Sequence, residues 1–315
     1  MPKPRKAIVC RSDTPYYHCV SRCVRRAYLC GHDQSTGESY EHRRDWIAQR
    51  LHILASLFTI DVCAYAVMSN HYHLVIKLST SSELSDEEVL TRWLTLFKGP
   101  VLVQRFQSGA ALSPAQQTTV TDIINVWRER LQDLSWFMKC LNEPIARQAN
   151  QEDGCTGHFW EARFKSQPLL TQEALLTCMA YVDLNPIRAG MANSPEESDF
   201  TSIQERVKPT TNPVLSRAVA DTHGLQPSQT PIQLQQLLHF EEATRFEPQT
   251  GIPFAFKDYL ALVDTTGRIV RADKRGVIPP NLAPILTRLN LTPDQWLINS
   301  TQFESVFYRR FRQAV

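Results

Sequence analysis

Residues 67–78, VMSNHYHLVIKL, form an apolar, β-prone run that contains two histidines, His71 and His73. Because side chains alternate between the two faces of a strand, the two imidazoles share one face. The other face carries Tyr72, Leu74, Ile76 and Leu78. The residues before this run are also β-prone, and the Ser-Asn pair at 69–70 is a turn signal. The stretch therefore predicts an antiparallel hairpin over residues 61–78 with both imidazoles on one face.

Two imidazoles on one strand face can share a metal ion, although an HxH pattern alone also fits histidines on a solvated face. A second segment adds chemistry: Tyr181 and Asn185 lie four residues apart on a predicted helix that ends at Pro186, so they are neighbours on one helix face. Asparagine offers a carbonyl oxygen as a ligand, and tyrosine offers a phenol oxygen as a nucleophile. A packing tyrosine and a helix-capping asparagine explain the same residues without any chemistry.

Working outward from the hairpin, hydrophobic periodicity assigns elements to most of the remaining chain. It predicts strands in residues 15–22 and 154–170, helices in 44–59, 85–97, 122–148 and 171–186, and a loop in 107–119. Pro144 is expected to kink or break the third of these helices. Near the C-terminus a strand pair is expected in residues 259–271, followed by helices around 279–290 and 303–312.

Composition narrows the class of protein. The chain has 315 residues, 43% of them hydrophobic, and a net charge of +2, which is too mild to indicate a nucleic-acid partner by itself. It lacks an apolar run of membrane-spanning length and an N-terminal signal sequence, so we expect a cytoplasmic protein with no membrane partner. The eight cysteines are expected to be reduced thiols, and the set His18, Cys19, Cys23 and Cys30 fits no standard zinc spacing.

Domain organisation follows from a change in composition. Residues 1–205 are expected to form one domain, the Pro, Ser, Thr and Gln-rich residues 206–249 a linker, and residues 250–315 a smaller, basic and mainly helical accessory region. The accessory region could grip DNA, contact a second subunit or serve as a packing appendage, and all three readings stay open.

Three ordered motifs, MSNHYHLVIK, GHFWEARFKS and AYVDLNPIRAG, resemble those of the single-tyrosine transposases of the HUH nuclease superfamily. Within that superfamily the chain looks most like the REP-associated tyrosine transposases, and YYHCVSRCVRR resembles their first strand. The likeness covers about residues 10–205. Three features differ from compact members: Ser69 replaces a usual proline, Cys23 replaces a usual glycine, and residues 79–135 look longer.

The resemblance implies an α+β, HUH-type (ferredoxin-like or RRM-like) fold, with an antiparallel sheet flanked by helices. It also implies that His71 and His73 are the catalytic, metal-binding pair, that Tyr181 is the nucleophile, and that Asn185 is the third metal ligand. The cofactor would be Mg²⁺, as in the family, or Mn²⁺, which suits two imidazole nitrogens better.

The implied activity is cleavage of single-stranded, hairpin-containing DNA through a 5′-phosphotyrosine intermediate, with rejoining of ends, by a nucleoid-associated enzyme. Candidate DNA-binding residues are Arg22, Arg25, Arg26, Arg163, Lys165 and Arg188. Trp160 and Phe164 could stack on bases, although core packing fits them better. A homodimer, and the question of whether Tyr181 serves its own histidines or a partner's, stay open.

Three alternatives remain at this level. The chain could be a catalytically inactive DNA-binding protein derived from a transposase. It could be a metal hydrolase that uses the HxH pair and water as the nucleophile. It could also be a relaxase-like replication initiator, although those usually carry a third histidine where this chain would use an amide.

Overall fold

The computed structural model describes residues 14–270 with short gaps between them. The gaps are residues 25–27, 34–35, 80–83, 193, 209–220, 222, 227–232 and 242–250. Arg25 and Arg26 therefore lie outside the described residues, as do the C-terminal helices expected around 279–290 and 303–312.

Four antiparallel strands form the central sheet. They are β1 (Tyr16–Arg22), β2 (Ile60–Val67), β3 (His71–Leu78) and β4 (Lys165–Pro168), in the order β2-β3-β1-β4. The hairpin expected over residues 61–78 is confirmed as β2 and β3, and its turn is the expected Ser-Asn pair. The α+β class, an antiparallel sheet flanked by helices, is confirmed as well.

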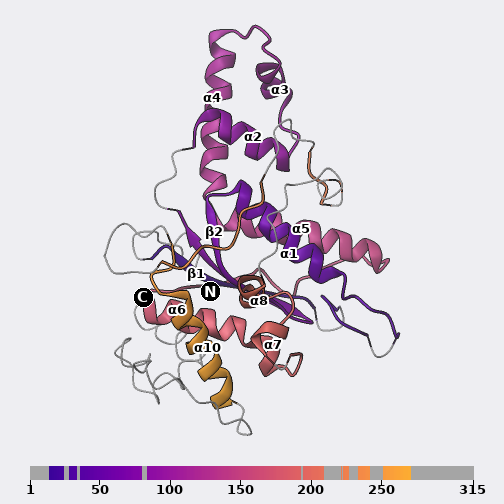
Figure 1. Ribbon diagram of the computed structural model, residues 1–315. Coiled ribbons are helices and arrows are strands. Elements are labelled where there is room, and N and C mark those ends of the chain that lie inside the picture. Colours follow the sequence, from indigo (N-terminus) through magenta and orange to yellow (C-terminus); the bar gives the residue numbers. More distant parts are fainter. Residues whose placement is uncertain are drawn as a thin grey trace, which may run out of the picture.

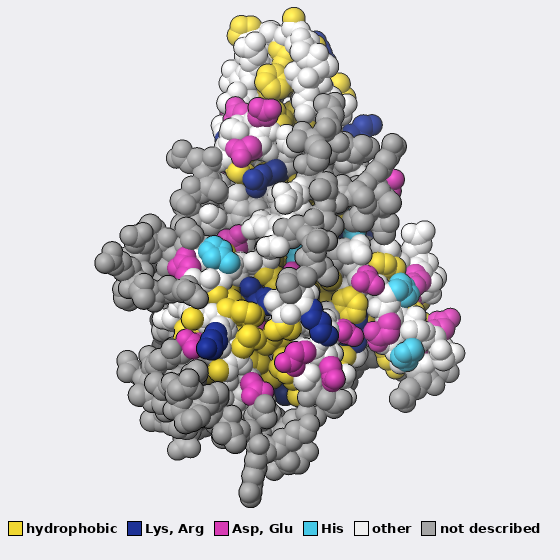
Figure 2. Space-filling model, viewed as in Figure 1, with side chains coloured by type: hydrophobic (Ala, Val, Ile, Leu, Met, Phe, Trp, Pro, Cys, Tyr) yellow, Lys and Arg dark blue, Asp and Glu magenta, His cyan; other side chains and the backbone are white. Residues whose placement is uncertain are grey.

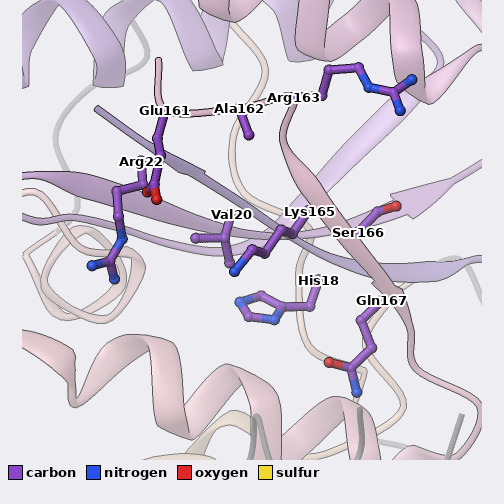
Figure 3. Close-up of a pocket in the computed structure, with 9 residues that line it drawn as sticks. All are labelled: His18, Val20, Arg22, Glu161, Ala162, Arg163, Lys165, Ser166 and Gln167. Carbon is purple, nitrogen blue, oxygen red and sulfur yellow. The ribbon is translucent and has the colours of Figure 1, made fainter. Parts of the chain in front are cut away.

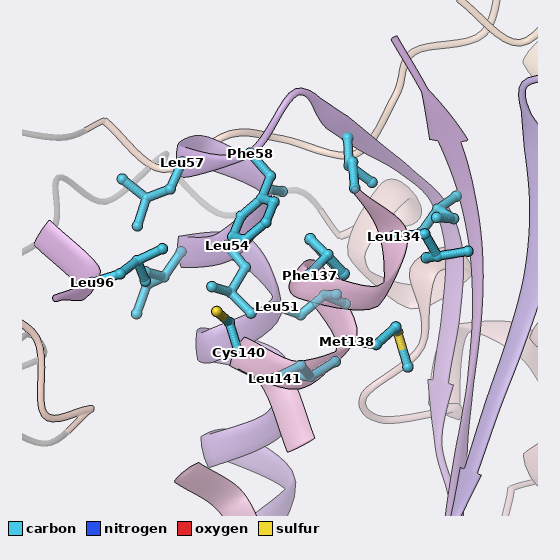
Figure 4. Close-up of a cluster of buried hydrophobic side chains, with 14 of the residues drawn as sticks. Leu51, Leu54, Leu57, Phe58, Leu96, Leu134, Phe137, Met138, Cys140 and Leu141 are labelled. Atoms are coloured by element: carbon cyan, nitrogen blue, oxygen red, sulfur yellow. The ribbon is translucent and has the colours of Figure 1, made fainter. Parts of the chain in front are cut away.

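Helices cover both faces of this sheet (Figure 1). Helices α1 (Arg43–Leu57) and α5 (Leu134–Glu152) pack on one face, and α6 (Gln172–Asp183) packs on the other. In the first layer the rings of Phe58 and Phe137 meet edge to face, with centroids 5.4 Å apart, among buried leucines of α1 and α5 (Figure 4). The sheet therefore separates two apolar cores, and the histidine pair faces the core beneath α6.

Three further helices project from the α1 side of the sheet (Figure 1). They are α2 (Asp86–Leu96), α3 (Val101–Gln107) and α4 (Pro114–Leu131). The capping box expected from Ser85 and Glu88 is present at the start of α2. The loop expected over residues 107–119 is shorter than expected, because Ser113 and Gln116 form a second capping box that starts α4.

Of the kink or break expected at Pro144, the break is wrong, because this proline lies inside α5. The chain breaks instead before α5, where the Asp133 side chain accepts a hydrogen bond from the Trp136 N–H and caps the helix. A proline inside a helix leaves the carbonyl four residues earlier without its usual donor. Arg50 Nε donates to that carbonyl, of Cys140, at 2.6 Å, so the freed acceptor is satisfied.

The chain after α6 departs from the sequence expectation in two ways. Pro186 does not end the helical region, because a second short helix, α7 (Asn185–Arg188), holds it in the first turn, where a missing N–H costs nothing. The strand pair expected in residues 259–271 is wrong, because the chain there forms the helix α10 (Phe256–Val270). Tyr259, Leu262 and the residues that follow at helical spacing are buried, and this period overrides the turn-like Thr-Thr-Gly.

Two short elements and parts of the Pro, Ser, Thr and Gln-rich segment complete the described chain. The elements are the 3₁₀ helix Pro195–Glu197 and α8 (Ser202–Val207). Leu237 and Leu238, within the segment expected to be a linker, are both buried, and the Leu238 N–H donates to the Val62 carbonyl at 2.8 Å. The described parts of this segment therefore pack against the sheet domain.

The surface shows side chains of both signs interspersed over the viewed face, with hydrophobic side chains gathered in its lower half (Figure 2). None of the described helices combines the length and the apolar character that a membrane span requires.

Candidate active site

The two histidines of β3 face α6, as the alternation along the strand predicts. Their neighbours Tyr72 and Leu74 belong to the opposite core, beneath α1 and α5. His73 is 1% exposed, and His71 is half-buried. The face that carries the two histidines is therefore not a solvated strand face, because α6 covers it.

Each imidazole of the pair is held through its Nδ1 atom. His71 Nδ1 lies 2.6 Å from the side-chain oxygen of Asn70, which can only accept, so Nδ1 carries the proton. His73 Nδ1 lies 3.0 Å from Nε2 of His18 on β1. His73 Nε2 is buried and has no hydrogen-bond partner among the described residues. His71 therefore carries its lone pair on Nε2, and His73 does so in the tautomer in which its Nδ1 donates to His18.

Burial keeps all three imidazoles neutral. It lowers the pKa of His18 to about 3 and, together with the positive charge of Arg22, lowers the pKa of His71 to about 4. The pKa of His73 is lowered well below its ordinary value, first by burial and then by His18 and His71. Neutral imidazole is also the form that a metal ligand requires.

The phenol of Tyr181 comes from α6 and meets the same imidazoles. Its ring lies edge-on to that of His73, with centroids 5.5 Å apart, and 6.4 Å from that of His18. The guanidinium carbon of Arg188 lies 5.3 Å from the tyrosine ring centroid. The structure therefore brings Tyr181, Arg188 and the histidines together at one end of α6.

Asn185 lies four residues after Tyr181, at the first position of α7. Its side-chain nitrogen is buried and has no hydrogen-bond partner among the described residues. That nitrogen is a donor, whereas a metal ion would be bound through the side-chain oxygen. Its assignment as the third metal ligand stays a prediction.

The residues present suit a divalent cation, and the fit rests on the orphaned Nε2 of His73. No group of three or more His, Cys, Asp or Glu side chains in the described part of the chain has the arrangement of a metal site. The expected set is of a different kind, because its third member is an amide. The alternative zinc set does not form around His18, because Cys19 enters the opposite core; no described cysteine forms a disulfide.

The described candidate DNA-binding residues lie in two places. Arg22, Arg163 and Lys165 line a pocket beside β1 and β4, and Arg188 lies at Tyr181 (Figure 3). Two of the three aromatics of the FWEARF motif pack in or against the core, as expected: Phe164 is 8% exposed, and Trp160 is partly buried, with its Nε1 donating to the Asn142 carbonyl at 2.9 Å.

Sequence reasoning missed three residues beside the site. His18 and Gln167 pair across β1 and β4, and only the strand register reveals that they lie on the histidine face. Asp183, two residues after Tyr181, is fully buried, and burial raises its pKa to about 6. It accepts hydrogen bonds from Ser202 of α8 and Tyr259 of α10, each at 2.5 Å, and so ties α6 to both helices.

The fold and the site define an α+β protein in which a strand-borne histidine pair faces a helix-borne tyrosine. No protein-family model matches the sequence, and no curated protein matches it. Among solved structures, the chain is similar to a REP-associated tyrosine transposase bound to a REP hairpin, with 14% identity and a TM-score of 0.32, over 63% of this chain and 81% of that one. What this chain does has to be inferred from its own residues.

Proposed function

We propose that this protein is a metal-dependent, single-stranded DNA endonuclease and strand transferase of the single-tyrosine type, with Tyr181 as the nucleophile. One observation carries the proposal: the Tyr181 ring packs edge-on against His73, whose buried Nε2 has no hydrogen-bond partner among the described residues. The three ordered sequence motifs that resemble REP-associated tyrosine transposases support it independently.

His71 and His73 would hold a divalent cation, Mn²⁺ or Mg²⁺, through their Nε2 atoms, and Asn185 would complete the protein ligands. Such an ion, when bound, polarises the scissile phosphate and offsets the charge that develops on it. Asn70 and His18 would keep both imidazoles in the tautomer that presents Nε2.

Tyr181 would attack the scissile phosphorus in line with the departing 3′-oxygen. The bond between phosphorus and the 3′-oxygen breaks, the bond between phosphorus and the tyrosine oxygen forms, and the 5′-phosphate stays on the enzyme. The phenol loses one proton and the departing oxygen gains one, so the step is balanced without a further reactant. A 3′-hydroxyl from another end can reverse the step and join the two strands.

Arg188 would stabilise the negative charge of the attacking phenolate. Its guanidinium carbon is 5.3 Å from the ring centroid, and burial lowers its pKa while the neighbouring Tyr181 opposes that shift. A guanidinium remains charged at neutral pH even when its pKa is lowered. A cation held there before the reaction needs no reorganisation as the charge develops.

The test is capture of the covalent intermediate. Purified protein is incubated with Mn²⁺ and a pool of single-stranded hairpins with randomised flanks, then separated under denaturing conditions. We expect an adduct that maps to Tyr181, that is lost in Tyr181→Phe and that persists in Tyr40→Phe, a change at a half-buried tyrosine whose exposed hydroxyl contacts Glu38.

The two main rivals predict different results. A metal hydrolase that uses water would cut the DNA without leaving an adduct. A DNA-binding protein that has lost catalysis would bind the hairpins with no cleavage, and wild type and Tyr181→Phe would then behave alike. Either result would remove Tyr181 from its assigned role.

A further inference from the structure

A pocket of about 500 Å³ opens beside the histidine face, between β1 and the segment that leads into β4 (Figure 3). Its lining consists of His18, Val20, Arg22, Glu161, Ala162, Arg163, Lys165, Ser166 and Gln167. Pockets that hold small organic ligands have volumes in this range.

Strand pairing places the pocket next to the candidate active site. Gln167 pairs with His18, and His18 is hydrogen-bonded to His73. Arg22 pairs with His71 at the other end of β1. A ligand in the pocket therefore lies beside the histidine pair.

Gln167 is the unusual member of the lining. It is 4% exposed, and its side-chain oxygen is buried without a hydrogen-bond partner among the described residues. Figure 3 shows this side chain in the pocket beside the His18 ring. An unsatisfied buried acceptor costs free energy, so its natural role is to accept a hydrogen bond from a ligand N–H.

The charges of the lining indicate what else the ligand carries. Arg22, Arg163 and Lys165 supply three cations, against the single carboxylate of Glu161 near Arg22. This balance favours a ligand with a phosphate. A phosphate together with a ring that offers an N–H group describes a nucleotide.

We propose that this pocket holds one nucleotide of the single strand next to the scissile phosphate, and that Gln167 recognises its base as adenine. The carboxamide of glutamine matches the adenine edge in two places: its oxygen accepts from the 6-amino group, and its nitrogen donates to N7. The proposal rests on the function proposed above. It assigns to Gln167 the selection of the base, which none of the proposed catalytic residues provides.

The experiment measures binding of labelled pentanucleotides in EDTA, so that neither cleavage nor metal contributes. The probes are dA5, dT5 and a pentamer of deoxyadenosine analogues that lack only the 6-amino group. We expect wild type to prefer dA5 over both other probes by about tenfold, the discrimination expected of one good bidentate pair. Gln167→Met should lose that preference and bind all three alike.

Two controls exclude structural explanations. Removing an unsatisfied buried oxygen should leave the melting temperature of Gln167→Met unchanged or higher, whereas a glutamine that supports the fold would lower it. Gln117→Leu, at an exposed glutamine of α4, one of the helices that project from the sheet, should keep the preference for dA5.

Other outcomes overturn the proposal in distinguishable ways. Equal binding of all probes by wild type would reject base recognition at Gln167 and leave the endonuclease proposal intact. In a separate calorimetric titration without EDTA, a tenfold loss of Mn²⁺ affinity in Gln167→Met would make this oxygen a metal ligand instead. Failure of wild type to bind any pentamer or any hairpin would reject both proposals together.

Discussion

His18 Nε2 lies 3.0 Å from His73 Nδ1, and the two rings are nearly parallel, with an interplanar angle of 6° and centroids 5.2 Å apart. The partners come from neighbouring strands and are 55 residues apart in the chain. This contact decides which nitrogen of His73 faces α6. If His73 donates from Nδ1, its buried Nε2 carries the lone pair that a cation needs.

The first prediction concerns this contact and the affinity for metal. His18→Leu removes the acceptor, whereas His18→Gln offers a side-chain oxygen that can still accept from His73 Nδ1. Outer partners of ligating histidines typically contribute about 10- to 100-fold in metal affinity. We therefore expect Mn²⁺ affinity, measured by calorimetry, to fall by about that factor in His18→Leu and to recover at least partly in His18→Gln. Equal affinities in all three proteins would separate His18 from the metal site.

The second prediction concerns Arg188. Removing its charge in Arg188→Gln takes away the cation that lies against the Tyr181 ring, and we expect adduct formation to slow by about 10- to 100-fold. Arg188→Lys keeps the charge and should retain part of the rate. As a reference, binding of an uncut hairpin is measured for both Arg188 substitutions in a protein that also carries Tyr181→Phe and therefore does not cleave. If both substitutions weaken binding as much as they slow adduct formation, Arg188 is only a phosphate contact.

The third prediction concerns stability in acid and a histidine remote from the site. His223 is 5% exposed, and burial, together with Arg50, lowers its pKa to about 4. Between about pH 4 and pH 6.5 the unfolded chain binds a proton at this histidine and the folded protein does not. The free energy of unfolding therefore falls as the pH falls through that window. The contribution of this histidine approaches about 1.4 kcal/mol per pH unit.

His223→Gln should remove that contribution. Between pH 6.5 and 4.5, we expect the free energy of unfolding in urea to fall less steeply for the variant than for wild type. Above pH 7.5, the difference in this free energy between the two proteins should be nearly constant. Curves that stay parallel through the whole range would show that His223 titrates alike in the folded and unfolded chains.

Alternation along a strand and helix-capping signals correctly predicted the elements whose structure depends on neighbouring residues in the sequence. The alternation in HYHLVIKL correctly predicted which face each side chain of β3 takes, and the Ser85 capping box correctly marked the start of α2. The break before α5 was assigned to Pro144, because nothing near that proline shows that Arg50, almost a hundred residues earlier, satisfies the freed carbonyl. The helix α10 was missed for a similar reason, because the apolar positions that define its helical period are buried against α6, which is distant in the sequence.

In the candidate site, too, some residues could be predicted from local sequence patterns and others could not. The histidine pair and Tyr181 belong to motifs that can be read in the sequence, and the structure brings their rings together. His18 and Gln167 could not be identified in that way, because their positions depend on the register between β1, β3 and β4. A single polar residue in a short strand carries no signal of its partner.

The fourth prediction tests the core that supports β3. Phe137 is fully buried, and its ring contacts that of Phe58 beneath the sheet (Figure 4). Phe137→Ala should cost about 3–5 kcal/mol of unfolding free energy, because it loses buried surface and leaves a cavity. Val101→Ala, at a side chain that is 70% exposed, should stay within about 0.5 kcal/mol of wild type in the same urea titration. Similar losses for the two variants would contradict the assigned packing.

The last prediction concerns how α10 holds the helix that carries Tyr181. The Tyr259 hydroxyl donates to the buried carboxylate of Asp183 at 2.5 Å, and both residues are fully buried. Tyr259→Phe keeps the ring and removes the donor, so that carboxylate loses a partner in a place water does not reach. We expect a loss of about 1–3 kcal/mol in unfolding free energy. Tyr40→Phe, which removes an exposed hydroxyl contact with Glu38, should cost less than about 1 kcal/mol.

A second measurement separates support of the fold from support of the site. Asp183 lies two residues from Tyr181 on the same helix, so loosening this contact should also slow adduct formation under conditions where Tyr259→Phe is fully folded. A variant that loses stability and yet forms the adduct at the wild-type rate would show that α10 stabilises α6 without positioning Tyr181.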